Sequence, residues 1–288
     1  MKKKVVLSTA VVTFFLALLI TLYPLISTAY NRQHQSQIHF QHQEQVEQAD
    51  NQALEAAWEL AEAYNAALVP GVQDLERFTP EQLEAAAEGY KDLLDIAGDG
   101  ILCYVTIPKL DACLPVYHGT SDDVLELGLG HLLGTSLPIG GSSSHSVLTG
   151  HSGLASQRLL SDLDQLEPGD VFYIEVLDKT LAYEVDQMKT VLPHETEDLQ
   201  IIPGQDYCTL VTCTPFGVNT HRLLVRGTRI PCEEAEEIAA ETVPEEHPVS
   251  TWEQEYWKGL SIGLGAVALT GLAALGFWTY RRCRRESS

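Results

Sequence analysis

Apolar and polar positions divide the chain into two long uncharged runs near its ends and a mixed region between them. The first run extends from Val5 to Tyr30 after three lysines, and the second extends from Gly259 to Tyr280 before a cluster of arginines. Each run reaches the roughly 20 residues that a bilayer requires. Because basic flanks of membrane helices face the cytoplasm, the pattern predicts spans at 1–30 and 259–280, a basic cytoplasmic tail at 281–288 and an extracellular segment between the spans. A signal peptide cleaved near Ala29 is the alternative, but its apolar core would cover only about 7–15 residues.

The region 31–100 is predicted to be mainly helical. Its first part (NRQHQSQIHFQHQEQ) is polar, and we interpret it as a juxtamembrane linker, with a metal site at His34, His39 and His42 as the alternative. Apolar residues then recur at helical spacing between residues 46 and 68. A further helix is expected to begin at Thr79-Pro80-Glu81-Gln82, a capping box with proline at the first helical position, and to run to about residue 95.

Residues 101–230 have the texture of a β domain, with short β-branched and aromatic runs separated by Gly, Pro and Asp. We expect strands at 101–107, 111–117, 145–150, 170–177, 180–191, 206–213 and 221–230, and short helices at 121–126 and within 152–163. Seven or eight short strands without alternating helices indicate an antiparallel barrel or sandwich. The Glu-rich residues 231–258 are predicted to form a self-repelling acidic stalk.

Charge and cysteine content exclude several functions. The chain has 18 Lys and Arg against 40 Asp and Glu, a net charge of -22, so it lacks the basic surface with which proteins bind nucleic acid. Its six cysteines are irregularly spaced without a CxxC pair, and we therefore expect no metal site. Cys103 and Cys113 lie on consecutive predicted strands, where two buried free thiols are favoured over a disulfide.

Cys213 and Arg222 are candidates for chemistry because one ends a predicted strand and the other opens the next. A hairpin would make them neighbours, and strand periodicity would turn Cys208 to the opposite face from Cys213. A guanidinium there could stabilise the oxyanion that forms when a thiolate attacks an acyl group. A structural thiol and an arginine paired with one of the many carboxylates are the alternatives.

A cysteine nucleophile also needs a proton partner, which is usually histidine. His151 lies at a predicted strand end between two glycines, a position typical of functional loops. Spacing alone does not select it over His131. The candidates are His118, His131, His145, His151, His194 and His221.

Five segments together resemble the class C, pilin-assembling sortases over about residues 90–230. They read IPKLDACLPVYHGT, GHLLGTSLPIGG, LTGHSG, LEPGDVFYIEV and DYCTLVTCTPFGVNTHRLLVRGTRI. The resemblance implies a mainly β, eight-stranded sortase barrel at 101–230 that works without a cofactor. It also implies that Cys213 is the nucleophile, His151 the general acid and base, and Arg222 the oxyanion or substrate stabiliser of a cysteine transpeptidase.

The same resemblance implies substrates and a location. Sortases of this class cleave LPXTG-like sorting signals between Thr and Gly, join pilins through lysine isopeptide bonds, and are held on the outer face of the membrane. The expected partners are therefore pilins, other surface proteins with such signals, and the lipid bilayer. Attachment of surface proteins to peptidoglycan is the alternative activity, and a non-catalytic membrane scaffold is the alternative of another class.

Two features depart from the family pattern. The family usually has a lid anchored by Asp-Pro-aromatic before the barrel, but no Asp-Pro occurs here, and the corresponding segment 70–82 contains Phe78 as its one aromatic residue. We hypothesise that the lid is absent or uses another anchor, which would make the enzyme less self-inhibited. Ser152 stands where the family often has arginine after the histidine, a change that would affect substrate choice.

Overall fold

The protein divides into two compact units, Met1–Pro248 and Val249–Ser288, in the computed structural model. The structure describes residues 2–68, 89–152 and 159–242, and in the second unit residues 254, 256–265, 267 and 269, which are helical. The hypothesised lid segment, the start of the predicted helix at 79 and the predicted tail at 281–288 lie outside these residues. Among the described residues, no helix combines the length and the apolar character needed to cross a membrane.

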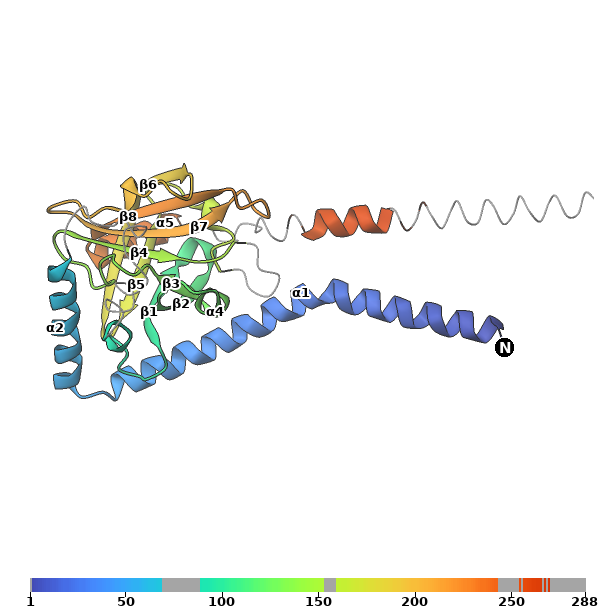
Figure 1. Ribbon diagram of the computed structural model, residues 1–288, viewed down its shortest axis with the longest axis horizontal. Coiled ribbons are helices and arrows are strands. Elements are labelled where there is room, and N and C mark those ends of the chain that lie inside the picture. The colour runs from blue at the N-terminus through green and yellow to red at the C-terminus, as the bar shows by residue number, and fades with distance from the viewer. Residues whose placement is uncertain are drawn as a thin grey trace, which may run out of the picture. The chain divides into compact units, whose positions relative to one another are not determined.

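Eight strands form a closed barrel in the order β1-β2-β3-β4-β7-β8-β6-β5 (Figure 1). The strands are β1 (Ile101–Ile107), β2 (Ala112–His118), β3 (Leu129–His131), β4 (Ser144–Thr149), β5 (Val171–Val176), β6 (Lys179–Val191), β7 (Asp206–Thr214) and β8 (His221–Ile230). The seven expected strands are confirmed within two residues, and β3 is an additional one. The barrel is not purely antiparallel, because β2 pairs with β3 and β4 pairs with β7 in parallel.

Alternation along the strands separates a core inside the barrel from a second apolar cluster outside it. Cys208 and Leu210 of β7 and Val225 of β8 are buried in the interior core. Val211 and Leu224, one residue further along their strands, belong instead to a cluster with Val147, Val191 and Leu199. Because side chains alternate across a sheet, this cluster lies on the outer face of β4, β7 and β8. Leu199 belongs to the connection between β6 and β7, so its packing holds part of this connection against the outer face.

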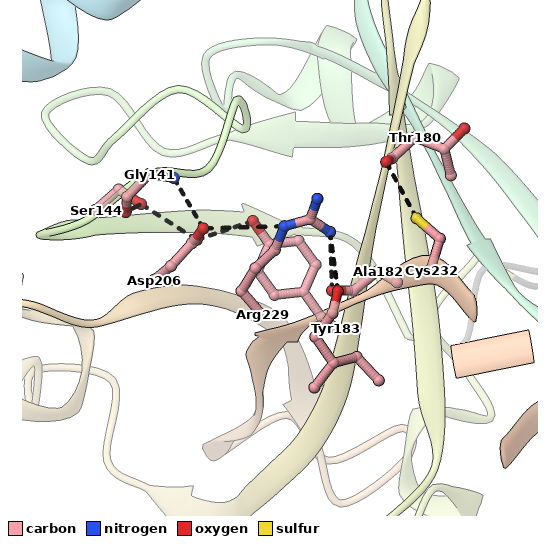
Figure 2. A network of polar contacts seen from close by, with 9 residues as sticks. Gly141, Ser144, Thr180, Ala182, Tyr183, Asp206, Arg229 and Cys232 are labelled. Carbon is pink, nitrogen blue, oxygen red and sulfur yellow. Dashed lines mark hydrogen bonds and ion pairs between the residues drawn. The ribbon is translucent and has the colours of Figure 1, made fainter. Parts of the chain in front are cut away.

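A polar network centred on Asp206 joins four strands near the start of β7 (Figure 2). The carboxylate of Asp206 accepts hydrogen bonds from the Gly141 amide (2.8 Å), the Ser144 hydroxyl (3.3 Å) and the Tyr183 hydroxyl (3.1 Å). The Arg229 guanidinium lies 4.0 Å away and also donates to the carbonyl of Ala182. Since Tyr183 is almost fully buried, these bonds satisfy polar groups that burial would otherwise penalise. The network fixes β4, β6, β7 and β8 relative to one another.

Two helices precede the barrel. Helix α1 runs without interruption from Lys2 to Glu47, and α2 (Asn51–Ala67) begins at Asp50, whose side chain accepts from the Gln52 amide. Residues 31–45 are helical, as expected for the region 31–100, and they do more than link two parts of the chain. His39 and His42 bind Glu175 (3.1 Å) and Asp99 (2.9 Å) near the barrel wall. Part of the polarity of this segment therefore serves contacts with the barrel.

Three shorter segments are also expected from the sequence to be helical, and the structure agrees with one of these predictions. Residues 89–95 contain a left-handed Gly89 and a 3-10 helix, Tyr90–Asp92, instead of the end of a continuous helix. Within the predicted helix at 152–163, residues 153–158 lie outside the described ranges and a 3-10 turn begins at Leu163. The short helix expected at 121–126 is confirmed as α4 (Asp122–Leu127).

The first part of the Glu-rich segment is an amphipathic helix, α5 (Cys232–Thr242). Ala235 is completely buried with Val171 and Ala182 of the barrel, and Ile238 packs against the same cluster. The expectation of a self-repelling stalk does not describe these residues, because the glutamates of one face remain exposed while small apolar residues of the other face contact β5 and β6. Residues 243–253 lie outside the described ranges.

Candidate active site

Cys213 and Arg222 lie directly opposite each other in the β7–β8 hairpin. The six-residue connection is closed by two amides, of Val218 and Asn219, which both donate to the carbonyl of Pro215 at 3.0 Å. Opposite residues of an antiparallel pair project from the same face, and the alternation described above places both on the outer face of the barrel. Cys213 is half-buried, whereas Cys208 is completely buried inside. The expected hairpin and the opposed faces of the two cysteines are confirmed.

The Arg222 guanidinium is held by backbone and not by a carboxylate. Its Nη1 donates to the carbonyls of His221 (3.0 Å) and Asn219 (3.3 Å). It makes no ion pair with any residue in the described part of the chain. Arg226, on the same face of β8, is by contrast engaged by two hydrogen bonds to Asp186 at 2.8 and 3.0 Å. The positive charge of Arg222 therefore remains available for a ligand beside Cys213.

Three hydrogen bonds position His151 next to the end of β7. Thr149 of β4 pairs in parallel with Val211, and the Gly150 amide donates to the Val211 carbonyl at 3.0 Å. The Thr212 hydroxyl donates back to the Gly150 carbonyl at 2.8 Å. The Ser152 hydroxyl donates to the Cys213 carbonyl at 2.7 Å. His151 is thus flanked on both sides by residues bonded to β7. If the register of Thr149 with Val211 is continued by two residues, His151 corresponds to Cys213.

The buried histidines have structural partners instead. His131 bonds Tyr90 (2.6 Å) and the Ser136 carbonyl (2.9 Å), and burial lowers its pKa to about 4. His145 bonds the Gln200 carbonyl and Thr209, and burial lowers its pKa as well. His118 bonds the carbonyl of Leu93, and again burial lowers the pKa. All three are neutral at pH 7 and act as hydrogen-bonding groups of the core.

The two remaining candidates are less well placed than His151. His221 pairs with Thr214, so its side chain alternates with that of Arg222 and leaves the opposite face, and its ring bonds the neighbouring Thr220 hydroxyl. His194 is exposed in the connection after β6. Within the described ranges, no group of three or more His, Cys, Asp or Glu side chains is arranged to hold a metal ion.

Sequence reasoning missed the hydroxyl groups that position the site. The sequence alone suggests a lost positive charge at Ser152, but the hydroxyl of this residue joins the histidine loop to the cysteine strand. Thr212 makes the reciprocal connection from β7 to the loop. The signal available in the sequence is the presence of a hydroxyl residue directly beside each candidate group. Only the parallel pairing of β4 and β7 turns that signal into two specific hydrogen bonds.

Together these groups have the composition of an acyl-transfer site. A half-buried thiol can attack a carbonyl, and a neighbouring imidazole can exchange the protons. A guanidinium that no carboxylate of the described chain neutralises can stabilise the oxyanion. Backbone pairing of β7 and β8 holds Cys213 opposite Arg222. His151 is held through the hydrogen bonds that its neighbours Gly150 and Ser152 make with β7.

Comparison with known proteins identifies the fold around this site. The model of the sortase domain matches residues 105–230, which include all three groups. The crystal structure of sortase C1 from Streptococcus agalactiae is 46% identical, with a TM-score of 0.60, and the match covers 66% of this chain and 96% of that one. Sortase C from Streptococcus pneumoniae is 45% identical, with a TM-score of 0.58, over 65% of this chain and 93% of that one.

Curated relatives match over a shorter part of their length. Sortase SrtE1 from Streptomyces coelicolor is 32% identical over 143 residues, which cover 43% of this chain and 39% of the relative. The chain thus spans about two fifths of that protein. The solved class C structures, in contrast, are covered almost completely and share more than two fifths of their aligned residues with it. The chain belongs to the sortase family, and within it to the class C sortases.

Proposed function

We propose that this protein is a membrane-anchored cysteine transpeptidase that cleaves LPXTG-like sorting signals between Thr and Gly and joins pilin subunits through lysine isopeptide bonds. The observation that carries the proposal is the register of β7 and β8, which sets Cys213 opposite an arginine that has no carboxylate partner among the described residues. The hydrogen bonds that join its neighbours Gly150 and Ser152 to β7 support His151 as the proton partner of this group.

In the first half-reaction, the Cys213 thiolate attacks the carbonyl carbon of the signal's Thr. The Arg222 guanidinium stabilises the negative charge that develops on the carbonyl oxygen, since a fixed cation beside a half-buried site acts more strongly than one in water. When the tetrahedral intermediate breaks down, the C–N bond to Gly is cleaved and His151 gives a proton to the leaving amine. The products are a thioester on Cys213 and the released C-terminal fragment.

In the second half-reaction, a lysine ε-amine attacks the thioester carbonyl. His151, now neutral, takes a proton from the attacking amine, and Arg222 stabilises the second oxyanion. Collapse of this intermediate breaks the C–S bond, leaves the isopeptide bond in place and returns Cys213 as a thiolate together with a protonated His151. Both half-reactions use the same three groups in the same positions, so neither requires a rearrangement of the barrel.

Two sets of observations support the pilin and membrane parts of the proposal. The Streptococcus pneumoniae structure bears on pilin substrate specificity, and a sortase C of Group B Streptococcus, 42% identical to this chain, is pilus-related. The uncharged runs at 5–30 and 259–280, each with a basic flank, support anchoring at both ends with the barrel outside.

The test is a comparison of cell-wall extracts from the native strain and from strains carrying Cys213→Ala or Cys232→Ala. The proposal requires that Cys213→Ala abolish the SDS-resistant ladder of high-mass pilin polymers while the pilin monomer remains. Cys232→Ala is the matched control, because it removes another half-buried thiol that lies on α5, and its ladder should equal that of the native strain.

Two other outcomes would replace the proposal. A persistent ladder with one surface protein lost from the wall to the medium would favour attachment to peptidoglycan. Unchanged ladders and wall proteins in the Cys213→Ala strain, together with no cleavage of an LPXTG peptide by the purified native protein, would favour a non-catalytic scaffold.

A further inference from the structure

A second cysteine outside the proposed active site also has a histidine and a carboxylate beside it. The Cys113 Sγ lies 3.7 Å from His39 Nδ1, and His39 Nε2 lies 3.1 Å from Glu175 Oε2. Glu175 is held in turn by the Thr106 hydroxyl (2.8 Å) and the Gln43 amide (3.3 Å). A thiol, an imidazole and an orienting carboxylate in this order form the arrangement that activates cysteine nucleophiles.

The three groups come from three different elements that meet on one wall of the barrel. Cys113 lies on β2, Glu175 on β5 and His39 on α1. Leu114 and Val116 of β2 point into the core, so Cys113 points outward, and it pairs across the strands with Thr106 of β1. In the strand order, β3 on one side and β6 on the other separate this wall from the β4-β7-β8 wall of Cys213. The two cysteines therefore belong to separate sites.

The charge on His39 is favourable for a thiolate. Hydrogen bonds with Cys113 and Glu175 raise the pKa of His39 to about 10, although burial opposes the shift. The same contact with His39 lowers the pKa of Glu175. His39 is therefore an imidazolium at pH 7, and a cation beside a thiol favours the reactive thiolate form. His39 is itself partly buried, with 23% of its side chain exposed, so solvent screens the contact less than it would on the surface.

A cavity of about 370 Å³ opens beside this cluster. Cys113 and His39 line it, together with side chains of α1, the β1–β2 turn and residues 159 and 162; these include Gln35, Thr106, Asp111 and Asp162. This volume is within the range of sites for small organic molecules and far exceeds that of a water molecule. The lining combines the Cys113 thiol and the His39 imidazole with polar side chains and the apolar Leu110 and Leu159, so the cavity suits a small organic molecule.

We propose that Cys113, activated by His39, which Glu175 orients, is a second reactive thiol that forms mixed disulfides with small organic disulfides entering this cavity. The Cys113 thiolate attacks one sulfur of the incoming disulfide, whose S–S bond breaks as the new bond to Sγ forms. The departing thiolate takes a proton from His39 Nδ1 and leaves as a thiol. Cys113 is oxidised and the small disulfide is reduced, so the exchange needs no other reactant.

The test measures this exchange at individual cysteines of the full-length protein with bis(2-hydroxyethyl) disulfide, an uncharged probe. Peptide mapping by mass spectrometry follows each thiol separately, and Cys232 is the internal reference because it is also half-buried but donates to the Thr180 carbonyl. At pH 7 we expect Cys113 to react about tenfold faster than Cys232, since an ordinary thiol is then only a few per cent thiolate.

The pH dependence of the exchange rate distinguishes a thiol that His39 activates from one that is only exposed to solvent. Between pH 6 and 8 the rate at Cys232 should rise steeply, whereas the rate at Cys113 should change by less than about threefold if it is already paired with the imidazolium. Among the described residues, the titratable groups around Cys113 are His39 on α1, Tyr104 on β1, Glu175 on β5, and Asp111 and Asp162 at the cavity. The contact with His39 lowers the pKa of Glu175, and burial raises the pKa of Tyr104 from an ordinary value that already lies above this range.

Two variants test the role of His39. His39→Gln should give Cys113 the steep profile of Cys232, even where displacement of α1 increases its exposure. Thr190→Ser, a change at an exposed position of β6 away from the cluster, should leave both profiles unchanged. A Cys113 rate equal to that of Cys232, or a profile unaltered by His39→Gln, would overturn the proposal. Neither result depends on Cys213, so the proposed transpeptidase function stands or fails separately.

Discussion

At the scale of single residues, the distinctive property of the candidate site is an arginine that no carboxylate of the described chain neutralises. In a protein with 40 acidic residues, an arginine would usually acquire a carboxylate partner. Backbone carbonyls of the β7–β8 turn hold Arg222 instead, which leaves its charge directed to whatever binds beside Cys213. The preference for an oxyanion thus follows from the local turn and not from the overall charge.

Replacement of Arg222 by alanine should lower kcat/KM for cleavage of an LPXTG peptide by about 10²–10³, the usual loss when an oxyanion donor is removed. Arg222→Lys should recover little of this, because an ammonium lacks the planar fork of the guanidinium. Arg226→Lys on the same face is the control and should retain most of the activity, since Arg226 is already paired with Asp186. Equal losses in the two lysine variants would contradict a special role for Arg222.

Ser152 should influence catalysis through position alone. Ser152→Ala removes the hydrogen bond to the Cys213 carbonyl, and we expect kcat to fall about tenfold with little change in KM, because small misplacements of reacting groups are costly. Ser152→Thr retains the hydroxyl and should restore most of the rate. Steady-state kinetics of both variants show whether kcat or KM changes. If Ser152→Ala raised KM at constant kcat, Ser152 would instead contribute to substrate binding.

At the scale of elements, the Asp206 network should determine how firmly the strands around the site are held. Asp206→Asn cannot accept all of the existing hydrogen bonds, so buried donors lose their partner, and we expect a loss of about 2–3 kcal/mol in the free energy of unfolding. Asp186→Asn, which breaks a more exposed pair with Arg226, should cost less than about 1 kcal/mol. Thermal unfolding of both variants provides the comparison, and similar midpoints would show that the network is dispensable.

The contact of α1 with the barrel should depend on pH through His39 and Glu175. The pKa of His39 is raised to about 10, so its contribution is complete below its ordinary value of 6.5 and is lost as the pH rises towards 10. The pKa of Glu175 is lowered, so its contribution is complete above 4.5 and is lost in more acidic solution. The difference in thermal midpoint between the native protein and His39→Gln should therefore be largest between pH 5 and 6.5 and should shrink towards pH 10. A constant difference across this range would contradict the charged contact.

The sequence predicts the strands well because their apolar periodicity is local, but it does not predict their partners. The seven expected strands are confirmed, whereas β3 is missed because three residues, two of them Gly130 and His131, give no periodic signal. The parallel pairing of β4 with β7 joins segments about 60 residues apart, and it alone explains why Ser152 bonds Cys213. For the same reason, the polar face of α1 resembles a linker in the sequence, since the carboxylates that bind its histidines lie far away along the chain.

At the scale of the whole molecule, the candidate active site and the cluster of Cys113 and His39 lie on separate walls of the barrel. The first is built by β4, β7 and β8 around Cys213, and the second forms where α1 contacts β2 and β5 around Cys113. The first belongs to the strands that the family shares, while the second requires the helix that precedes the barrel. Changes in α1 should therefore affect Cys113 without altering the chemistry proposed for Cys213.

The proposed anchoring makes a prediction for the full chain. Native protein should sediment with membranes and require detergent for extraction. A chain lacking residues 2–30 or residues 259–288 should still sediment, because one uncharged run of that length suffices to hold a protein in a bilayer. A chain lacking both segments should be released. Recovery of the native protein in the soluble fraction without detergent would contradict anchoring, and membrane fractionation followed by immunoblotting decides between these outcomes.

The unbroken course of α1 has a mechanical consequence. Residues 31–47 form helix and are fastened to the barrel wall near their end by His39 and His42. At 1.5 Å per residue, this part is a stiff arm about 25 Å long. A flexible linker of the same length would instead let the barrel reorient freely. With residues 5–30 in the bilayer, as proposed, the arm would limit the height and the orientation of the candidate active site above the membrane. A growing pilin polymer would then leave the enzyme within a restricted range of directions.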